Sequence, residues 1–460
     1  MTKPLVYFNG VHFSKGGYSR QPMNWEDFVS SLRFSRIQKE RIYRSGIEPD
    51  WRDPVKAGWG VIFHEEESCL IKQALEPLLQ KRSKTVAPHF REMIYKQGES
   101  KNGFLGRYGV GPGPVEPTRV PYYLLIVGPP TRIPFSIQYM LSTRYAVGRL
   151  CLDTPEEYAQ YAQNICSLEE DDTRGPKRMA FFGVENPDDP LTEMSNQWLM
   201  NPLSRILDEK KPEDWQIDTF IGKNADKSQL QRLLGGSQSP ALLFTTSHGI
   251  QLREPPHLQK QIQGSIICSD WPGPAWQGQL QRAHYFSHLD VGEQGDLRGM
   301  ISFHFGCYTG GTPRYDSFFK DPREQEADHG DAAEPPENPL LAEEPFVARL
   351  PQRLLARKKG LSAVVAHVDQ AFPHSFFWDE TLNQTLVFQQ LFLELMKGSP
   401  VGFAMKVISR RCSDIEMELM TGQEMDPGWV SSPDEKAKLW IGYQDAKNYV
   451  ILGDPLARVS

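Results

Sequence analysis

Apolar runs that alternate with helix-like segments are the feature that most limits how this chain can fold. From residue 178 onward these runs are six to eight residues long, and longer segments with helical periodicity separate them. Parallel strands joined through helices form right-handed crossovers, so the pattern predicts a mostly parallel α/β sheet flanked by helices on both faces. The predicted strands span residues 178–184, 216–222, 241–246, 300–305 and 361–368.

A second, less regular pattern of the same kind lies nearer the N-terminus. A helix-like stretch over residues 155–169 ends it, and the polar run after that helix is interpreted as a joint. We therefore predict an N-terminal α/β subdomain over residues 1–175 and a second α/β domain over residues 176–460. The predicted strands of the first part span residues 58–63, 122–127 and 145–150.

Two stretches of the second domain are too long to be simple connections. Residues 251–295 contain two tryptophans and several prolines. Residues 321–345 hold nine acidic residues, one arginine and five prolines, with few large apolar residues. That composition favours a mobile loop or a partly disordered linker. The functional alternative is a loop that the protein cuts itself or that gates its substrate.

Charge and cysteine usage exclude several classes of protein. The net charge is −7, and most of it lies in the acidic stretch, so the chain lacks the basic surface that nucleic-acid binding needs. The six cysteines are scattered singly, which argues against structural zinc and a disulfide framework. No apolar run approaches a membrane span, and the first residues lack the layout of a secretion signal. We expect a soluble cytoplasmic protein with no cofactor, no direct nucleic-acid partner and no membrane partner.

Two reactive side chains follow two of the predicted strands. His248 comes just after the strand that ends at Thr246, and Cys307 just after the strand that ends at Phe305. In an open parallel sheet, ligands and chemistry collect at the carboxyl ends of the strands. A cysteine and a histidine placed there supply a thiol nucleophile and its acid–base partner. We therefore predict that His248 and Cys307 form the catalytic dyad of a cysteine hydrolase.

Each of these two residues alone has a simpler structural explanation. A cysteine after an apolar strand is more often a small buried hydrophobic residue, and a histidine in a turn is commonly a surface residue. The pair is favoured because both residues are flanked by glycine and follow successive strands of one predicted sheet. A metal site is not expected, because no tight ligand pattern is formed by the nearest candidates, Cys268, His284 and His288.

The two turns resemble those of a known family. Thr246-Ser-His-Gly249 is similar to the histidine turn of caspase-like (clan CD) cysteine peptidases. Gly306-Cys-Tyr-Thr-Gly310 resembles the cysteine turn of their bacterial CHAT-type and gingipain-type relatives, and it departs from the Gln-Ala-Cys pattern of animal caspases. The run Gly453-Asp-Pro455 and the segment 126–134 resemble further parts of the bacterial branch. The resemblance covers roughly residues 120–460.

This resemblance implies a caspase-like catalytic domain preceded by a non-catalytic subdomain. It implies a cysteine endopeptidase in which Cys307 accepts the acyl group and His248 protonates the leaving amine. The backbone N–H groups of Gly249 and Cys307 would stabilise the oxyanion, and Gly249 would let the substrate carbonyl approach because it has no Cβ. Bacterial relatives often act as defence effectors, which implies a specific protein substrate. We also expect gating by an activating protein, an effector ligand or processing.

The resemblance also implies which segments line the pocket for the residue before the cleaved bond. They are the exit of the first strand of the domain, the residues just before the cysteine, and the loop after the fifth strand. Acidic residues predominate there and arginine is absent, whereas a pocket for aspartate would need guanidinium donors. We therefore expect cleavage after arginine or lysine. The structural alternatives are solvated loop carboxylates and a core histidine. The predicted pocket residues are Glu185, Asp188, Asp189, His304, Asp369 and Gln370.

Two other classes of function stay open. A caspase-like protein that has lost catalysis would serve as a binding or regulatory protein, and the intact dyad argues against that reading. A nucleotide-binding α/β protein would need a glycine-rich phosphate loop. Neither G-x-x-x-x-G-K-[ST] nor a G-x-G-x-x-G run after a predicted strand is present.

Overall fold

The structure of the protein is a computed structural model. It describes residues 49–170, 177–236, 238–252, 255–317, 340–379, 382–424 and 433–459. All of these residues belong to one compact unit. The acidic stretch 321–345 lies mostly outside the described residues, as does the predicted boundary near residue 175.

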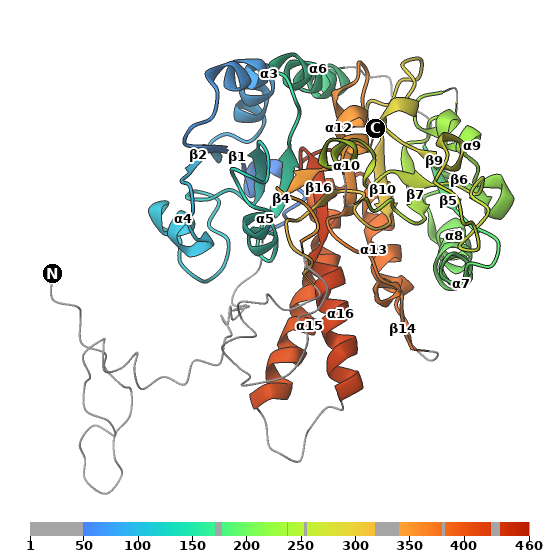
Figure 1. Ribbon diagram of the computed structural model, residues 1–460. Coiled ribbons are helices and arrows are strands. Elements are labelled where there is room, and N and C mark those ends of the chain that lie inside the picture. Colours follow the sequence, from blue (N-terminus) through green and yellow to red (C-terminus); the bar gives the residue numbers. More distant parts are fainter. Residues whose placement is uncertain are drawn as a thin grey trace, which may run out of the picture. The chain divides into compact units, whose positions relative to one another are not determined.

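A ten-stranded sheet forms the centre of this unit (Figure 1). Neighbouring strands are parallel except for one antiparallel pair in the middle, so the sheet consists of two parallel blocks that run in opposite directions. In spatial order, the first block contains β2 (Phe90–Tyr95), β1 (Trp59–His64), β3 (Tyr123–Val127), β4 (Ala146–Leu150) and β16 (Tyr449–Gly453). The second block continues with β13 (Ala363–His367), β10 (Ile301–Phe305), β7 (Leu242–Thr246), β5 (Arg178–Gly183) and β6 (Gln216–Ile221).

Helices bury both faces of this sheet. On one face a single apolar core crosses both blocks, from Phe63 on β1 to Phe182 on β5. It is closed by α3 (Cys69–Thr85), α6 (Pro155–Glu170) and α12 (Arg349–Ala356). The other face is covered by α4 (Lys101–Arg107) and α5 (Phe135–Ser142) over the first block, and by α8 (Asn201–Lys210) and α13 (Thr385–Met396) over the second. Each fully buried phenylalanine or leucine contributes about 1.5–3 kcal/mol to the free energy of unfolding.

The Gly-Asp-Pro run after β16 fastens the C-terminal strand to the first block. Asp454 is fully buried, and its carboxylate accepts hydrogen bonds from Trp59 Nε1 at 2.9 Å and from Arg82 Nε at 2.8 Å. Arg82 is itself buried and also pairs with Glu169 on α6. One carboxylate therefore ties β1, α3 and β16 together.

A helical hairpin projects from the sheet. It consists of α15 (Lys406–Glu424) and α16 (Pro433–Lys447), which pack against each other and extend away from the strands (Figure 1). The C-terminal end of α16 leads almost directly into β16, so the base of the hairpin lies at the middle of the sheet.

The predicted fold class, a mostly parallel α/β sheet flanked by helices, is confirmed, and every predicted strand is present. Two strands of the ten-stranded sheet, β2 and β16, and the reversal of direction between β13 and β16 were not predicted. The division into residues 1–175 and 176–460 stays a prediction, and β16 from the end of the chain pairs with β4 of the first part.

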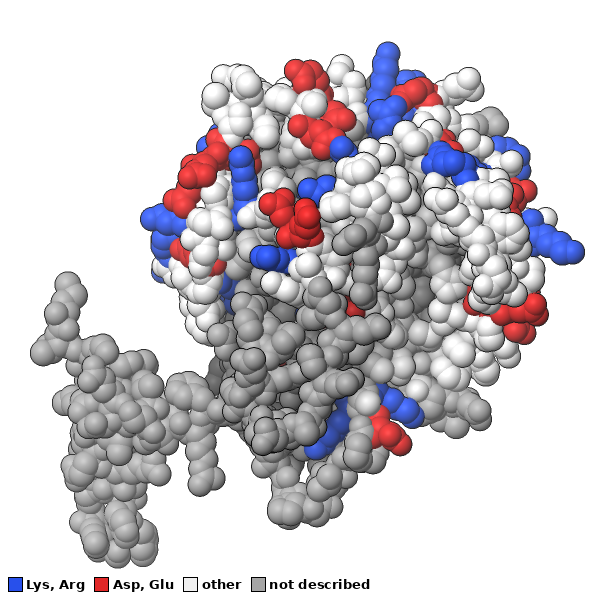
Figure 2. Space-filling view, viewed as in Figure 1, with Lys and Arg blue, Asp and Glu red and all other residues white. Residues whose placement is uncertain are grey.

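Charge on the described surface is mixed. On the face drawn in Figure 2, basic and acidic side chains are interspersed, without an extended area of one sign. Within the described part of the chain, no helix has the length and apolar character needed to cross a bilayer.

Candidate active site

The register of β7 and β10 brings the two predicted catalytic residues together. Thr246 pairs with Phe305 at the carboxyl ends of these neighbouring strands. His248 and Cys307 each lie two residues further along the chain, so they leave the same edge of the sheet side by side. The sequence motif alone could not give this proximity, because it depends on which strands pair.

The same register places two predicted pocket residues at the ends of this row. Gly183 of β5 pairs with Thr246 of β7, which gives Glu185 the same offset as His248. His304 of β10 pairs with Ala366 of β13, which gives Asp369 the same offset as Cys307. The order across the edge is therefore Glu185, His248, Cys307 and Asp369.

The turns that carry His248 and Cys307 touch through their backbones. Ser247 N donates to Phe305 O at 3.1 Å, and a Cβ on Gly249 would lie 1.7 Å from the carbonyl oxygen of Cys307. Glycine is thus required at position 249 because the neighbouring turn approaches so closely. This contact explains the residue without the predicted approach of a substrate carbonyl. Within the described residues, neither Gly249 N–H nor Cys307 N–H donates to a backbone carbonyl, and both residues are half-buried. Both groups therefore remain candidates for holding an oxyanion.

His248 has a carboxylate partner that sequence reasoning assigned to the pocket. Its Nε2 lies 2.8 Å from Oδ2 of Asp189, whose side chain is almost fully buried. The other oxygen of Asp189 accepts from Leu191 N at 3.2 Å and so caps α7 (Pro190–Ser195). Since the helix fixes Asp189, the carboxylate holds one ring nitrogen of His248 and leaves Nδ1 for proton transfer.

The insertion over residues 251–295 supports the imidazole from another side. The indole of Trp271 meets the His248 ring edge-on, with centroids 5.9 Å apart and an interplanar angle of 89°. Asn186, which is buried, donates from Nδ2 to the carbonyl of Trp271 at 2.9 Å and so fixes that segment. The insertion therefore contributes directly to the order of the site.

Cys307 is protonated in this resting arrangement. Its sulfur receives a hydrogen bond from Ala371 N at 3.4 Å. Burial raises the pKa of the Cys307 thiol to about 11; the Ala371 N–H opposes this rise, and the charge of Asp369 adds to it. A thiolate would therefore form only when a base takes the proton as a substrate arrives.

Three non-glycine residues at the site have a left-handed backbone. Asp188, Tyr308 and Asp369 have φ values of 54°, 61° and 77°. Asp188 precedes Asp189, the partner of His248; Tyr308 follows Cys307, and Asp369 lies at the exit of β13. Such conformations cost of order 1–3 kcal/mol each and persist only where the surrounding structure holds them. Their concentration at this edge indicates that its loops are held in specific shapes.

Asp369 is buried and occupied. Only 1% of the residue is exposed, and its Oδ2 accepts hydrogen bonds from Ser317 N at 3.1 Å and Ser317 Oγ at 2.7 Å. Burial raises the pKa of Asp369 to about 6; the Ser317 bonds lower it, and the charge of Asp316 raises it. The predicted Gln370 donates from Nε2 to Asp316 at 2.9 Å. Asp369 thus lies beside Cys307 with Ser317 covering one of its oxygens, and Asp316 lies close enough to raise its pKa.

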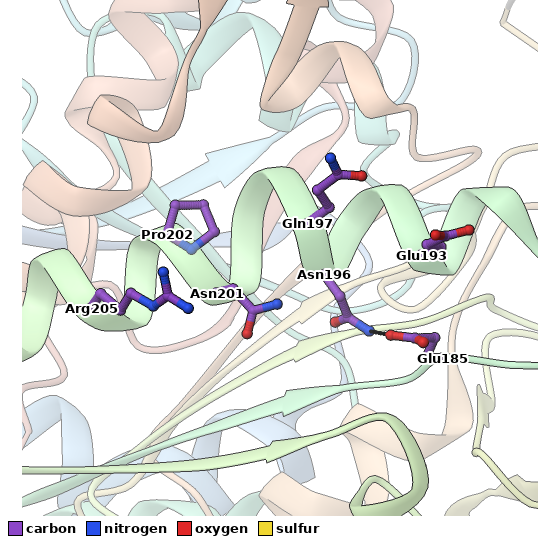
Figure 3. Close-up of a pocket in the computed structure, with 7 residues that line it drawn as sticks. All are labelled: Glu185, Glu193, Asn196, Gln197, Asn201, Pro202 and Arg205. Atoms are coloured by element: carbon purple, nitrogen blue, oxygen red, sulfur yellow. Dashed lines mark hydrogen bonds between the residues drawn. The ribbon is translucent and has the colours of Figure 1, made fainter.

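The other predicted pocket residues lie elsewhere. Glu185 accepts from Asn196 Nδ2 at 3.1 Å, and the two point toward each other at a shallow pocket of about 430 Å³ (Figure 3). Asp188 is exposed. The pocket in Figure 3 is lined by Glu185, Glu193, Asn196, Gln197, Asn201, Pro202 and Arg205, and not by Cys307.

His304 belongs to the core, which corrects its predicted place in the pocket. It is 1% exposed, and its ring nitrogens pair with Thr245 Oγ1 at 3.0 Å and Ser302 Oγ at 2.9 Å. Burial lowers the pKa of His304 to about 3, so the ring is neutral. Side chains alternate between the two faces of the sheet along β10, and the ring of His304 lies on a buried face beside Thr245 and Ser302.

The role of Asp189 and the support from Trp271 were missed by sequence reasoning. Asp189 precedes Pro190 at a helix start, which is a typical N-cap signal, but that signal says nothing about a second bond to His248. Among the described residues, no three His, Cys, Asp or Glu side chains gather as a metal site requires.

Comparisons with known proteins add little at this level. No protein-family model matches the sequence, and no curated protein matches it. Among solved structures, the chain is similar to one described as a protease, at 11% identity and a TM-score of 0.47, covering 88% of this chain and 78% of that chain. It is also similar to a chain of the Saccharomyces cerevisiae separase–securin complex, at 11% identity and a TM-score of 0.33, covering 72% of this chain and 15% of that chain. Neither likeness establishes a family or an activity for this protein.

Proposed function

We propose that this protein is a cysteine endopeptidase that cuts a protein substrate after a basic residue. The observation that carries the proposal is the paired exit of His248 and Cys307 from β7 and β10. The bond between Asp189 and His248 supports it, because a buried carboxylate orients the ring and stabilises the imidazolium that forms during proton transfer.

The arrangement supports a two-step acyl transfer. Cys307 sulfur attacks the scissile carbonyl carbon while the thiol proton passes to His248 Nδ1, and that proton then goes to the leaving amine. Water attacks the resulting thioester; its proton passes to His248 and returns to the sulfur as the acid product leaves. In both steps the carbonyl oxygen becomes negative, and the N–H groups of Gly249 and Cys307 would donate to it.

Asp369 is the pocket residue we propose for substrate recognition. It stands next to Cys307 in the row of strand exits, and the charge of Asp316 acts on it. A carboxylate in a water-poor pocket favours a guanidinium or ammonium group over a neutral or acidic side chain. The expected preference is therefore arginine or lysine before the cleaved bond.

The covered state of Asp369 supports a gated enzyme. Ser317 and the Gln370 N–H fill its two oxygens, and the Cys307 thiol is protonated, so neither recognition nor attack is poised before a substrate or activator arrives. A defence role and the identity of the partner stay predictions that depend on the resemblance described above.

A panel of fluorogenic peptides that differ only before the cleaved bond tests the proposal. We expect the wild type to cut peptides with arginine or lysine and to spare those with aspartate or leucine. The Cys307→Ala variant should cut none, whereas Cys69→Ala, which changes an exposed cysteine on α3, should match the wild type. Cleavage by Cys307→Ala would overturn the mechanism, and a preference for aspartate or leucine would overturn the specificity.

The same protonated thiol and covered pocket also favour the second candidate, a caspase-like regulatory protein without catalysis. Intact mass spectrometry with a peptidyl-arginine chloromethyl ketone separates the two. One adduct on Cys307 supports the peptidase, and no adduct after long incubation supports the regulatory protein.

A further inference from the structure

Asp445 is a buried carboxylate for which the proposed chemistry has no use. It lies in the last turn of α16 and has no exposed surface. A carboxylate is disfavoured there twice, by the loss of hydration and by the negative end of the helix dipole. Such a group persists when the hydrogen bonds that it accepts offset these costs.

The bonds that Asp445 accepts come from the loop that follows β13. Its Oδ1 accepts from Phe372 N at 2.9 Å, and its Oδ2 accepts from the hydroxyl of Ser375. Ser375 Oγ also lies 2.7 Å from Tyr449 Oη at the start of β16. His367 Nε2, in the core, is 3.3 Å from Oδ1 of Asp445. One carboxylate therefore connects the base of the hairpin to the loop over residues 369–376.

That loop carries two of the groups that act at Cys307. Its first residue, Asp369, is the proposed recognition carboxylate, and Ala371 N donates to the sulfur at 3.4 Å. The near end of the loop is fixed to the cysteine turn, because Tyr308 N donates to Asp369 O at 2.7 Å. Asp445 fixes the far end, three residues beyond Asp369 and one beyond Ala371. Further along, Arg411 donates to His374 O and Phe376 is buried in the core, and Asp445 holds the part of the loop next to Ala371.

We propose that Asp445 is a positioning residue that holds the 369–376 loop against Cys307 and thereby sets the selectivity of the site for basic residues. This inference rests on the proposed function. The charge of Asp445 also contributes to the raised pKa of the Cys307 thiol. Removing that charge should therefore increase the reactivity of the Cys307 thiol. The loss of loop order should, in contrast, decrease the turnover of substrate.

The test is Asp445→Asn, which keeps the shape of the side chain. The amide is uncharged and has one acceptor oxygen, so it cannot accept from both Phe372 N and Ser375 Oγ as the carboxylate does. We expect kcat/KM for the arginine peptide to fall about tenfold or more, since small misplacements at a reacting centre have effects of that size or larger. The ratio of kcat/KM for arginine over methionine peptides should fall with it. The rate of Cys307 alkylation by iodoacetamide at pH 8 should rise at least twofold.

Internal controls separate positioning from loss of fold. Cys268 and Cys412 are buried, so mass spectrometry of each cysteine reports whether Asp445→Asn opens the whole structure. Faster alkylation of Cys307 with Cys268 and Cys412 still protected supports the inference, and simultaneous alkylation of Cys268 and Cys412 overturns it as a local effect. Asp434→Asn makes the same charge change at the exposed start of α16 and should match the wild type.

A second variant keeps the charge. Ser375→Ala removes one donor from Asp445 and should lower the arginine-to-methionine ratio by a smaller factor, without the rise in alkylation. An unchanged ratio in both variants, or an equal loss for both peptides, would overturn the inference. If the wild type cuts no peptide at all, the proposed function fails, and the site-resolved alkylation of Asp445→Asn still decides whether Asp445 holds the loop.

Discussion

Buried polar side chains at the strand ends of the first block are paired with other side chains and carbonyl groups, whereas those that follow the strands of the second block surround a thiol. In the first block, Arg149 on β4 is fully buried and donates to Gly128 O at 2.9 Å, Ile133 O at 2.7 Å and Gln138 Oε1 at 2.9 Å. Asp454 after β16 is equally well paired, with Arg82. In the second block, one ring nitrogen of His248 pairs with Asp189, and the Cys307 sulfur makes only long contacts, at 3.4 Å to Ala371 N and 3.7 Å to Ala371 O.

The two blocks therefore differ at the loops that follow their strands, and their strands are similar. Both blocks are parallel and, apart from the edge strands β2 and β6, buried on both faces, so the strands themselves carry no sign of function. Three of the four non-glycine residues described with left-handed φ belong to the exits of the second block. A fully satisfied polar group stabilises the fold, and a partly satisfied one at a held loop is available for chemistry.

The largest effect is expected when the partner of His248 is changed. Asp189→Asn retains an oxygen that can cap α7 but places an amide where Nε2 of His248 needs an acceptor. We expect kcat to fall about a thousandfold, because a misoriented imidazole in the wrong tautomer cannot accept the thiol proton. The melting temperature should change by no more than about 2 °C, since asparagine is as good an N-cap as aspartate.

Asp226→Asn is the matched control for this prediction. Asp226 caps α9 (Lys227–Leu233) in the same way, with its side chain accepting from Gln229 N at 2.7 Å. This variant should retain wild-type kcat. More than a tenth of wild-type activity in Asp189→Asn would contradict the assigned role of Asp189.

The next effect concerns stability and belongs to the first block. Asp454→Asn leaves the buried guanidinium of Arg82 paired with Glu169 alone, so we expect the free energy of unfolding to fall by about 3 kcal/mol, the lower end for a broken buried pair. Urea unfolding measures this loss, and kcat of the folded fraction should be unchanged. Asp214→Asn removes an exposed pair with Lys177 and should cost no more than about 1 kcal/mol. A fall in kcat of the folded Asp454→Asn protein would contradict the purely structural role assigned to the first block.

A third effect depends on pH. The pKa of Asp369 is raised to about 6, so acidification below pH 6 neutralises the carboxylate proposed to bind a basic residue. We expect kcat/KM for the arginine peptide to fall about tenfold per pH unit below 6, whereas a methionine peptide should lack this limb. Asp369→Asn should remove the limb together with the preference for arginine. An identical profile for both peptides would contradict the role of Asp369.

Protonation of Asp369 also changes the free energy of unfolding, in the direction opposite to the expected change in activity. The folded pKa of Asp369 lies above its ordinary value of 3.8, so the folded state binds the proton more tightly than the unfolded state. This group therefore adds stability as pH falls through 6, and loses that contribution as pH rises. A drop in activity between pH 6 and pH 5 that accompanies an unchanged or higher melting temperature cannot arise from unfolding.

The sequence predicted the strands of this protein better than their directions. Strands buried on both faces are continuous apolar runs, such as Tyr123–Val127, and these were found. β2 was missed because it lies at the edge of the sheet and exposes Arg91 and Glu92. β16 was interpreted only as part of a turn, and the antiparallel β13–β16 pair follows from contacts between distant parts of the chain.

The candidate site was predictable to a similar extent. His248 and Cys307 were chosen from turn sequences, and their proximity follows from strand pairing. Three carboxylates follow β5, and nothing in the sequence distinguishes Asp189, which bonds His248, from the exposed Glu185 and Asp188. His304 was misplaced because its direction depends on the pleat of β10 and on hydroxyl partners from neighbouring positions.

The smallest expected effect is on KM, and it concerns the hydroxyl of Ser317 in the second block. Ser317→Ala removes the 2.7 Å bond to Asp369 and keeps the backbone bond from the same residue. At pH 8 Asp369 is ionised in either protein, so an incoming guanidinium would meet one competitor fewer. We expect KM for the arginine peptide to fall two- to fivefold with little change in kcat, which corresponds to about one modest hydrogen bond. Ser83→Ala, a hydroxyl on α3 that bonds only its own helix, should leave KM unchanged. An unchanged or higher KM in Ser317→Ala would mean that Ser317 orders the recognition carboxylate without covering it, and the second block would then be as fully satisfied at this position as the first.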